Sequence, residues 1–331
     1  MLAMVCCLAG PALTVIQAAA PQQRGQALGV RDVTVTEIPG IVANGTTWKL
    51  VWQGTDNADG IVGTADGGLL FAQEQPNRIS KLDQNDRVSV FVENTHGAGA
   101  VALDTNSRVL AVERTCTDPG LSLPCSEPTV VGVLYPENER KVLADSFDGK
   151  PLGRLNDLVV HRNGTVYFTV GGAFSVGPGG QVMSIGDNIR ANGIVLSPDE
   201  KTLYVTNGST ILAFDVRPDG SATNRRDFGT LEAGGSGDGM AVDAAGRLYV
   251  TSNSGVQVLS PDGKYLGLIP TPRSVISVAF SGPDKKTLYV VGSGAVDVSG
   301  REIATPPGVR NNAKSIYKIP MLAQGFKGRA K

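Results

Sequence analysis

A unit of two short hydrophobic strands joined by a tight turn recurs along most of the chain. In one copy, apolar residues alternate from Ile194, the chain reverses at Pro198-Asp199, and alternation resumes at Leu203. Such alternation is typical of half-buried strands, and the turn residues tolerate the backbone of a reversal. Each copy opens at an anchor position. The six anchors are Asp59, Gly99, Asn156, Asn192, Asp238 and Ile276.

The spacing of these anchors indicates the fold class. Consecutive anchors lie 40, 57, 36, 46 and 38 residues apart, and the longest interval contains an insertion with two cysteines. A four-stranded propeller blade takes about 40–50 residues. The sequence therefore predicts an all-β fold, a six-bladed β-propeller, as a single domain over residues 21–331. An open β array or two sandwiches is the alternative, although neither explains a repeat of this period.

Strand-like segments also flank the repeats. Val33 to Ile38 and Trp48 to Gln53 precede the first anchor, and Ser315 to Pro320 follows the last copy. Closing a propeller removes free sheet edges, which otherwise promote aggregation. We therefore expect a strand from one terminus to complete a blade begun by the other.

Composition and charge agree with a β protein that binds a small molecule. Glycine is abundant at 42 residues, and aromatic residues make up only 5% of the chain, which suits short strands and tight turns. The 30 basic and 31 acidic residues nearly cancel, and no basic run is present. The sequence thus argues against nucleic acid and anionic membranes as partners. It leaves the oligomeric state open.

The first residues have the character of a targeting segment. No charged residue occurs from Met1 to Gln23, and the apolar run ends in small residues. We interpret residues 1–20 as a signal peptide and expect a periplasmic or secreted protein with no membrane contact after processing. The alternative is a retained membrane anchor, although Gly10-Pro11 interrupts the apolar run.

Oxygen-bearing side chains recur at four of the anchors. The four are Asp59, Asn156, Asn192 and Asp238. Because the innermost strands of a propeller surround its central channel, we expect these side chains to meet at one channel mouth. Two carboxylates and two carboxamides suit Ca²⁺. Zn²⁺ and Mg²⁺ are further options, but with only two histidines, His96 and His161, a nitrogen site has few ligands. Taken singly, an Asn-Gly or Asp-Gly anchor is equally a common turn.

Several stretches resemble one known family. Arg154 to Val160 (RLNDLVV), Ala191 to Asn207 and Gly237 to Val250 are similar to blade motifs of the senescence marker protein/gluconolactonase family. Val278 to Val290 resembles the motif of its last blade, and the likeness extends from Asp59 to Pro320. The resemblance implies a six-bladed propeller and a calcium- or zinc-dependent hydrolase that opens a sugar-type lactone.

The resemblance also implies roles for individual residues. Asn156, Asn192 and Asp238 match the metal ligands of the family, with Asp238 as general base, and Arg154 matches its substrate-contacting arginine. Asp59 stands where the family has a glutamate in a Glu-Gly-Pro motif, and its side chain is one methylene shorter. A looser or water-mediated contact of Asp59 with the metal follows.

Other interpretations stay open at this point. Arg154 is alternatively a solvated loop charge, and His96 is either an acid/base near the channel mouth or an ordinary loop histidine. Glu74 and Glu113 follow second strands and are expected to be solvated or at blade rims, with a position facing the channel as the alternative for Glu113. No Gly-x-Ser-x-Gly element supplies a serine nucleophile. A related esterase or phosphotriesterase, or a non-catalytic binding propeller, is the alternative function.

Cys116 and Cys125 lead to a first testable prediction. Both fall in the 57-residue interval between anchors, and an exported protein can join them as a disulfide. Thiol titration of the denatured, processed protein should detect no free thiol. Two titratable thiols would show that the pair is reduced, which is the alternative left by spacing alone.

Overall fold

The computed structural model describes residues 29–114 and 128–328. The predicted signal peptide and both Cys116 and Cys125 lie outside these residues. The described chain is almost entirely β, with one short 3-10 helix, η1 (Glu137–Glu139). None of its helices is long and apolar enough to cross a membrane.

The described strands form six four-stranded antiparallel sheets, which are the blades. Blade 1 consists of β2 (Ile61–Gly63), β3 (Leu69–Gln73), β4 (Arg78–Leu82) and β5 (Val88–Glu93). Blade 2 consists of β6 (Ala98–Leu103), β7 (Val109–Glu113), β8 (Val130–Tyr135) and β9 (Lys141–Ala144). Blade 3 consists of β12 (Leu158–Val160), β13 (Val166–Thr169), β14 (Ala173–Val176) and β15 (Val182–Ser184).

The other three blades follow the same plan. Blade 4 consists of β16 (Ile194–Leu196), β17 (Thr202–Asn207), β18 (Thr210–Val216) and β19 (Ala222–Thr230). Blade 5 consists of β20 (Met240–Val242), β21 (Leu248–Ser252), β22 (Gly255–Leu259) and β23 (Tyr265–Pro270). Blade 6 consists of β24 (Val275–Ser281), β25 (Thr287–Ser293), β26 (Ala313–Pro320) and β1 (Lys49–Gln53). A small hairpin, β10 (Ser146–Phe147) and β11 (Lys150–Pro151), precedes blade 3.

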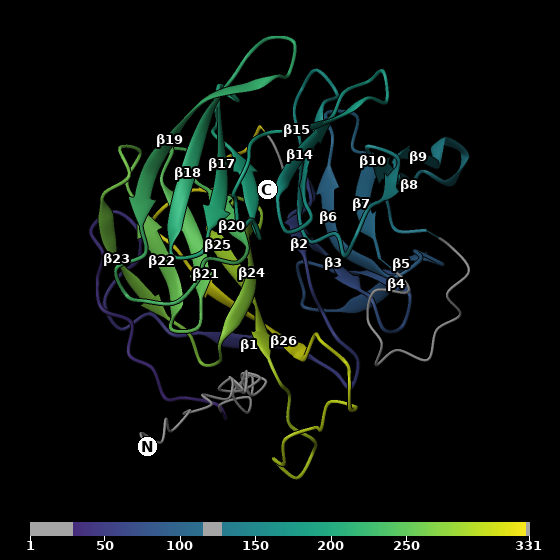
Figure 1. Cartoon of the computed structure of the whole chain (residues 1–331). Coiled ribbons are helices and arrows are strands. Elements are labelled where there is room, and N and C mark those ends of the chain that lie inside the picture. Colours follow the sequence, from purple (N-terminus) through teal and green to yellow (C-terminus); the bar gives the residue numbers. More distant parts are fainter. Residues whose placement is uncertain (1–28, 115–127, 329–331) are drawn as a thin grey trace, which may run out of the picture.

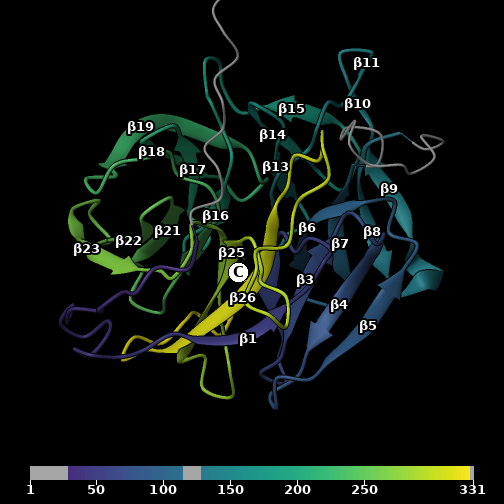
Figure 2. The same ribbon diagram turned by 90° about the horizontal axis from the view of Figure 1, so that it is seen from below.

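The blades are arranged in a closed ring. The first strand of each blade contacts the first strand of the next, in the order β2, β6, β12, β16, β20, β24 and back to β2. Figure 2 shows the blades following one another in chain order around this ring, and Figure 1 shows the ring from the side. The predicted six-bladed β-propeller is confirmed.

The ring is closed by the N-terminal strand. β1 pairs antiparallel with β26, with Lys49 opposite Lys318 and Gln53 opposite Ser315. The last blade therefore takes its outermost strand from the start of the described chain and its other strands from the end. This confirms the expectation that one terminus completes a blade begun by the other.

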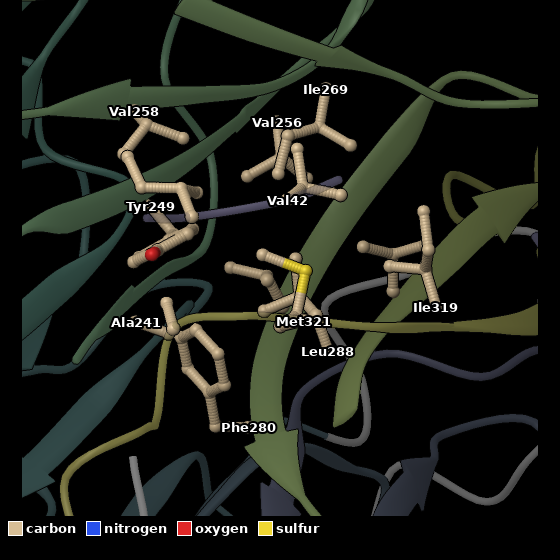
Figure 3. Close-up of a cluster of buried hydrophobic side chains, with 14 of the residues drawn as sticks. Val42, Ala241, Tyr249, Val256, Val258, Ile269, Phe280, Leu288, Ile319 and Met321 are labelled. Atoms are coloured by element: carbon tan, nitrogen blue, oxygen red, sulfur yellow. The ribbon is translucent and has the colours of Figure 1, made fainter. Parts of the chain in front are cut away.

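The segment Val33 to Ile38 does not form the predicted strand. It contributes only an isolated bridge between Ile38 and Val42. Val42 is buried among residues of blades 5 and 6, including Tyr249 and Met321 (Figure 3). The apolar residues of this segment are therefore buried against two blades although the segment is irregular. Burial alone gives the same hydrophobic pattern as a strand paired in a sheet.

The glycines that follow three anchors have a packing role. Gly60, Gly193 and Gly239 lead directly into the first strands of their blades and lie in no turn, so the turn interpretation of these Asp-Gly and Asn-Gly pairs is wrong. A Cβ on Gly193 would lie 2.0 Å from the backbone oxygen of Asp238, which belongs to the next blade. Gly60 approaches Ala100 in the same way. Glycine is therefore required where adjacent innermost strands touch.

Gly193→Ala tests this requirement. Because backbone on the neighbouring blade has to move, we expect the free energy of unfolding to fall by about 3 kcal/mol. Denaturant unfolding would measure the change. Gly179→Ala is the control, since nothing lies within 4 Å of a Cβ built there. Equal stability of the two variants would contradict the packing role.

Candidate functional site

One cavity of about 1340 Å³ receives side chains from all six blades. Its lining includes, in blade order, Asp59, Arg114, Asn156, Asn192, Asp238 and Ile276. Arg154 lines it as well. The structure thus brings the five residues singled out from the sequence, namely Asp59, Arg154, Asn156, Asn192 and Asp238, to a single cavity.

The connection between β25 and β26 provides a further wall, which the sequence did not indicate. Thr305, Pro306 and the run from Gly308 to Asn312 line the cavity. The connection is held near its middle by an ion pair of 2.7 Å between Arg273 Nη2 and Glu302 Oε1. The buried ammonium of Lys314 donates to the backbone oxygen of Ala304 at 3.0 Å. These contacts give the wall a defined position beside the anchors.

The anchors hold their positions through backbone hydrogen bonds to the second strand of their own blade. The amide of Asn156 donates to the Thr169 oxygen at 2.8 Å, and that of Asp238 to the Thr251 oxygen at 3.0 Å. The amide of Asp59 donates to the Ala72 oxygen at 2.9 Å. These three anchors are therefore bonded extensions of the inner hairpins rather than parts of free loops.

Buried threonines lie at equivalent positions of three second strands, and two of them join neighbouring blades. Thr206 Oγ1 accepts the amide of Asn192 at 2.9 Å. Thr169 Oγ1 donates at 2.6 Å to the backbone oxygen of Asn192, which lies in the next blade. Thr251 Oγ1 donates at 3.1 Å to the oxygen of Ile276, also in the next blade. The recurring threonine was visible in the repeats, but its cross-blade role was not.

The two anchor carboxamides meet directly. Asn156 Nδ2 donates to Asn192 Oδ1 at 2.8 Å. Together with Asp238 they place amide and carboxylate oxygens on the same cavity, a donor set that fits a hard cation such as Ca²⁺. Within the described chain, no three His, Cys, Asp or Glu side chains gather closely enough to bind a metal. A cation here would thus depend on the carboxamides.

Asp59 is held by side chains from two other segments of the chain. Its Oδ2 forms an ion pair with Arg114 Nη2 and accepts a hydrogen bond of 2.9 Å from Asn311 Nδ2. Asn311 belongs to the wall formed by the β25–β26 connection. Neither partner of Asp59 was indicated by the sequence. The carboxylate predicted to face a metal is therefore already in contact with a fixed positive charge.

The expectation of a solvated Glu74 is wrong. Glu74 is buried, with 1% of its side chain exposed. Its two oxygens accept from Arg154 Nη1 and Nη2 at 2.9 and 2.8 Å, a bidentate pair. It also accepts from Arg114 Nε at 3.1 Å. Glu74 and Arg114 each directly follow the second strand of adjacent blades. Glu74 and Arg114 thus occupy the same repeat position in neighbouring blades and have opposite charges. This was the feature of the sequence from which their pairing could have been predicted.

Burial and charge act against each other in this cluster. Burial by itself lowers the pKa of the Arg114 guanidinium, but Asp59 and Glu74 outweigh it and raise the pKa above its ordinary value. Burial raises the pKa of the Asp59 carboxyl, and Arg114 opposes that rise. Arg114 thus remains a permanent cation beside the cavity.

His96 and Glu113 form a separate cluster. His96 Nδ1 lies 3.0 Å from Glu113 Oε2, and Arg140 Nη2 lies 3.3 Å from the same oxygen. Neither His96 nor Glu113 is among the described residues that line the large cavity. Glu113 is buried rather than solvated, and burial raises its pKa against the opposing charges of Arg140 and His96. The loop interpretation of His96 agrees with this placement.

Residues 57–294 match the family described as the SMP-30/Gluconolactonase/LRE-like region. This match covers most of the chain, and the chain belongs to that family.

Relatives of known name lie at modest identity. A gluconolactonase of Zymomonas mobilis is 30% identical over 186 residues, which cover 47% of this chain and 52% of that protein. The Xenopus laevis regucalcin is 29% identical over 247 residues, covering 68% of this chain and 79% of the relative. A pentonolactonase of Haloferax volcanii is 28% identical over 187 residues, covering 52% of this chain and 64% of the relative. The chain thus spans about half the length of the gluconolactonase that it matches.

Solved structures agree with the fold. A gluconolactonase of Xanthomonas campestris superposes with a TM-score of 0.70 at 22% identity, covering 90% of this chain and 98% of that structure. A calcium-binding protein, regucalcin, of Agrobacterium tumefaciens gives a TM-score of 0.63 at 18% identity, covering 85% and 95%. At these identities the likeness supports the propeller architecture.

Glu74→Gln tests the buried ion cluster. The substitution removes the negative charge that the buried guanidinium groups of Arg114 and Arg154 contact. The free energy of unfolding should therefore fall by about 3–5 kcal/mol. Chemical denaturation would measure this loss. Glu137→Gln, on the exposed helix η1, is the matched control. A loss below about 1 kcal/mol, typical of a surface ion pair, would show that the cluster is not a stabilising unit.

Proposed function

We propose that this protein is a lactone hydrolase that opens a sugar-type lactone at the mouth of the propeller channel. One observation carries the proposal: Arg154, Asn156, Asn192 and Asp238 line one cavity in a chain that belongs to this family. The named relatives include a gluconolactonase and a pentonolactonase, which supports a lactone as substrate.

The cavity residues suit the steps of lactone opening. We assign Asp238 as the general base that takes a proton from the attacking water. The water oxygen forms a bond to the carbonyl carbon, the ring C–O bond then breaks, and the proton passes from Asp238 to the leaving alkoxide oxygen. The product is one open-chain molecule with a new hydroxyl and a carboxylic acid, which then loses its proton to solvent.

Arg154 has the geometry of a substrate-orienting residue. Its guanidinium is fixed by the bidentate contact with Glu74 and still lines the cavity. A fixed donor group holds a sugar hydroxyl or carboxylate with little loss of side-chain freedom on binding. The interpretation of Arg154 as a freely solvated loop charge does not agree with this contact.

A divalent cation fits the proposal. Asn156, Asn192 and Asp238 would hold Ca²⁺, and the ion would polarise the lactone carbonyl and lower the pKa of a bound water. Calcium is favoured by the oxygen donors and by the likeness to regucalcin, with Zn²⁺ or Mg²⁺ as the other options.

Turnover of gluconolactone tests the function. Asp238→Asn keeps the size of the side chain but removes the base, so kcat/KM should fall about 10³-fold. Asn156→Ala should mainly raise the Ca²⁺ concentration needed for activity. Asp262→Asn, on an exposed turn between β22 and β23 of the same blade, is the control and should retain wild-type turnover.

The same assay decides between the alternatives. It should be run on lactones, aryl esters and phosphotriesters, with and without chelator. Preferred turnover of esters or phosphotriesters would change the substrate class to that of a related hydrolase. No turnover on any substrate would replace the lactonase with a non-catalytic, ligand-binding propeller.

A further inference from the structure

The large cavity extends well beyond the anchors. Its volume of about 1340 Å³ exceeds the roughly 300–1,000 Å³ that is typical of sites for drug-sized ligands. Besides the anchors, it is lined by residues that follow β21, flank β24 and β25, and form the wall between β25 and β26. One sugar ring bound at the anchors would therefore fill only part of it.

A continuous row of neutral residues forms the second part of the cavity. Ser274 Oγ donates to the backbone oxygen of Asn253 at 3.2 Å, and the amide of Ser293 donates to the backbone oxygen of Ser274 at 2.8 Å. The amide of Gly294, which follows Ser293, donates to the backbone oxygen of Asn312 at 2.8 Å. We call Asn253, Ser274, Ser293 and Asn312 the neutral row; all four line the cavity. The row leads from blade 5 across blade 6 to the wall.

The neutral row has hydrogen-bonding groups that the protein itself does not use. Within the part of the chain that the structure describes, the side-chain amides of Asn253 and Asn312 and the hydroxyl of Ser293 bond no other protein group. Each amide offers two donors and an acceptor, and the hydroxyl both donates and accepts. Sugar hydroxyls need such mixed partners. They can replace the water at these groups with little loss of hydrogen bonding.

The backbone of the neutral row is fixed from outside the cavity. Buried Arg273 donates from Nη1 to the backbone oxygen of Ser293 at 3.1 Å and pairs with Glu302 of the wall. Arg31 Nη2 donates to the backbone oxygen of Asn253 at 3.2 Å. A site with a fixed backbone loses little freedom when a ligand binds, which favours affinity.

The surroundings of the neutral row suit an uncharged ligand. The sixth anchor is the apolar Ile276, and Val309 of the wall also lines the cavity. Among the described wall residues that line the cavity, Arg310 alone is charged. Apolar side chains beside a few hydrogen-bonding groups match a sugar ring, which has both C–H groups and hydroxyls.

We propose that the neutral row binds a second sugar unit, so that the substrate is an aldobionolactone, a sugar lactone joined by a glycosidic bond to an uncharged sugar. This proposal rests on the proposed function and specifies its substrate class. The lactone ring lies at the anchors, where it is opened, and the second unit lies along the neutral row. Binding energy from a part of the substrate remote from the reacting bond raises kcat/KM when it is realised in the transition state.

Turnover of cellobionolactone and of gluconolactone by the full chain tests the proposal. The value of kcat/KM should be at least about tenfold higher for cellobionolactone, because its second unit forms additional hydrogen bonds. Asn253→Ala and Asn312→Ala should each lower the ratio of the two kcat/KM values by about three- to tenfold, because each removes one of these bonds. Asn138→Ala, on the exposed helix η1 away from the cavity lining, is the matched control and should keep the wild-type ratio.

An equal or lower kcat/KM for cellobionolactone would overturn the proposal, as would an unchanged ratio in both cavity variants. A preference for a lactone whose second sugar is a uronic acid would also overturn it, because a charged group rather than the neutral row would then select the substrate. Thermal melting would verify that each variant folds. If one variant does not fold, the other variant and the preference of the wild type still decide.

Calorimetric binding of the open-chain acids, cellobionate and gluconate, separates this proposal from the proposed function. No lactone turnover together with tighter binding of cellobionate would discard the lactonase and keep the neutral row as a sugar site. Gluconolactone turnover without preference for cellobionolactone would keep the lactonase and discard the sugar site. Neither turnover nor binding would discard both.

Discussion

The close approach of the innermost strands is the constraint on which the site depends. At the contact between blades 4 and 5, the backbone of Asp238 lies so near Gly193 that no side chain fits between them. Gly60 makes the same kind of contact with the following blade. In these blades the anchor immediately precedes the glycine. The contact that packs one blade against the next therefore also fixes the position of the polar side chain. Threonines such as Thr206 then hold the anchor backbone from the second strand.

Charge is distributed unevenly around the cavity. On the side of blades 1 to 3, Glu74 and Asp59 share two arginines, Arg114 and Arg154, in a buried ion cluster. On the side of blades 3 to 5, Asn156, Asn192 and Asp238 present amide and carboxylate oxygens. Burying charges costs solvation energy that their mutual attraction offsets only in good geometry. The bidentate contact between Glu74 and Arg154 has that geometry, and it leaves Arg154 preorganised at the cavity.

Features that follow from a local repeat were predicted well. The hairpin around Pro198-Asp199 is as expected, with a turn at these residues between β16 and β17. Features that depend on packing between distant segments were not. Val33 to Ile38 has a strand-like pattern but lies against blades 5 and 6 without forming a strand. Glu74 has a sequence context typical of a solvated residue, although the adjacent blade covers it.

The sequence by itself determined the number of blades and the positions of the anchors, because a hydrophobic period and its turn residues are encoded within about 40 consecutive residues. Only the tertiary structure decided the partners of those anchors. Asp59 meets Arg114, 55 positions away, and Asn311, 252 positions away. The first pair joins blades 1 and 2, and the second joins blade 1 to the β25–β26 connection of blade 6, because these blades become neighbours in the closed ring. Periodicity reports local burial, whereas the pairing of buried charges depends on which blades become neighbours.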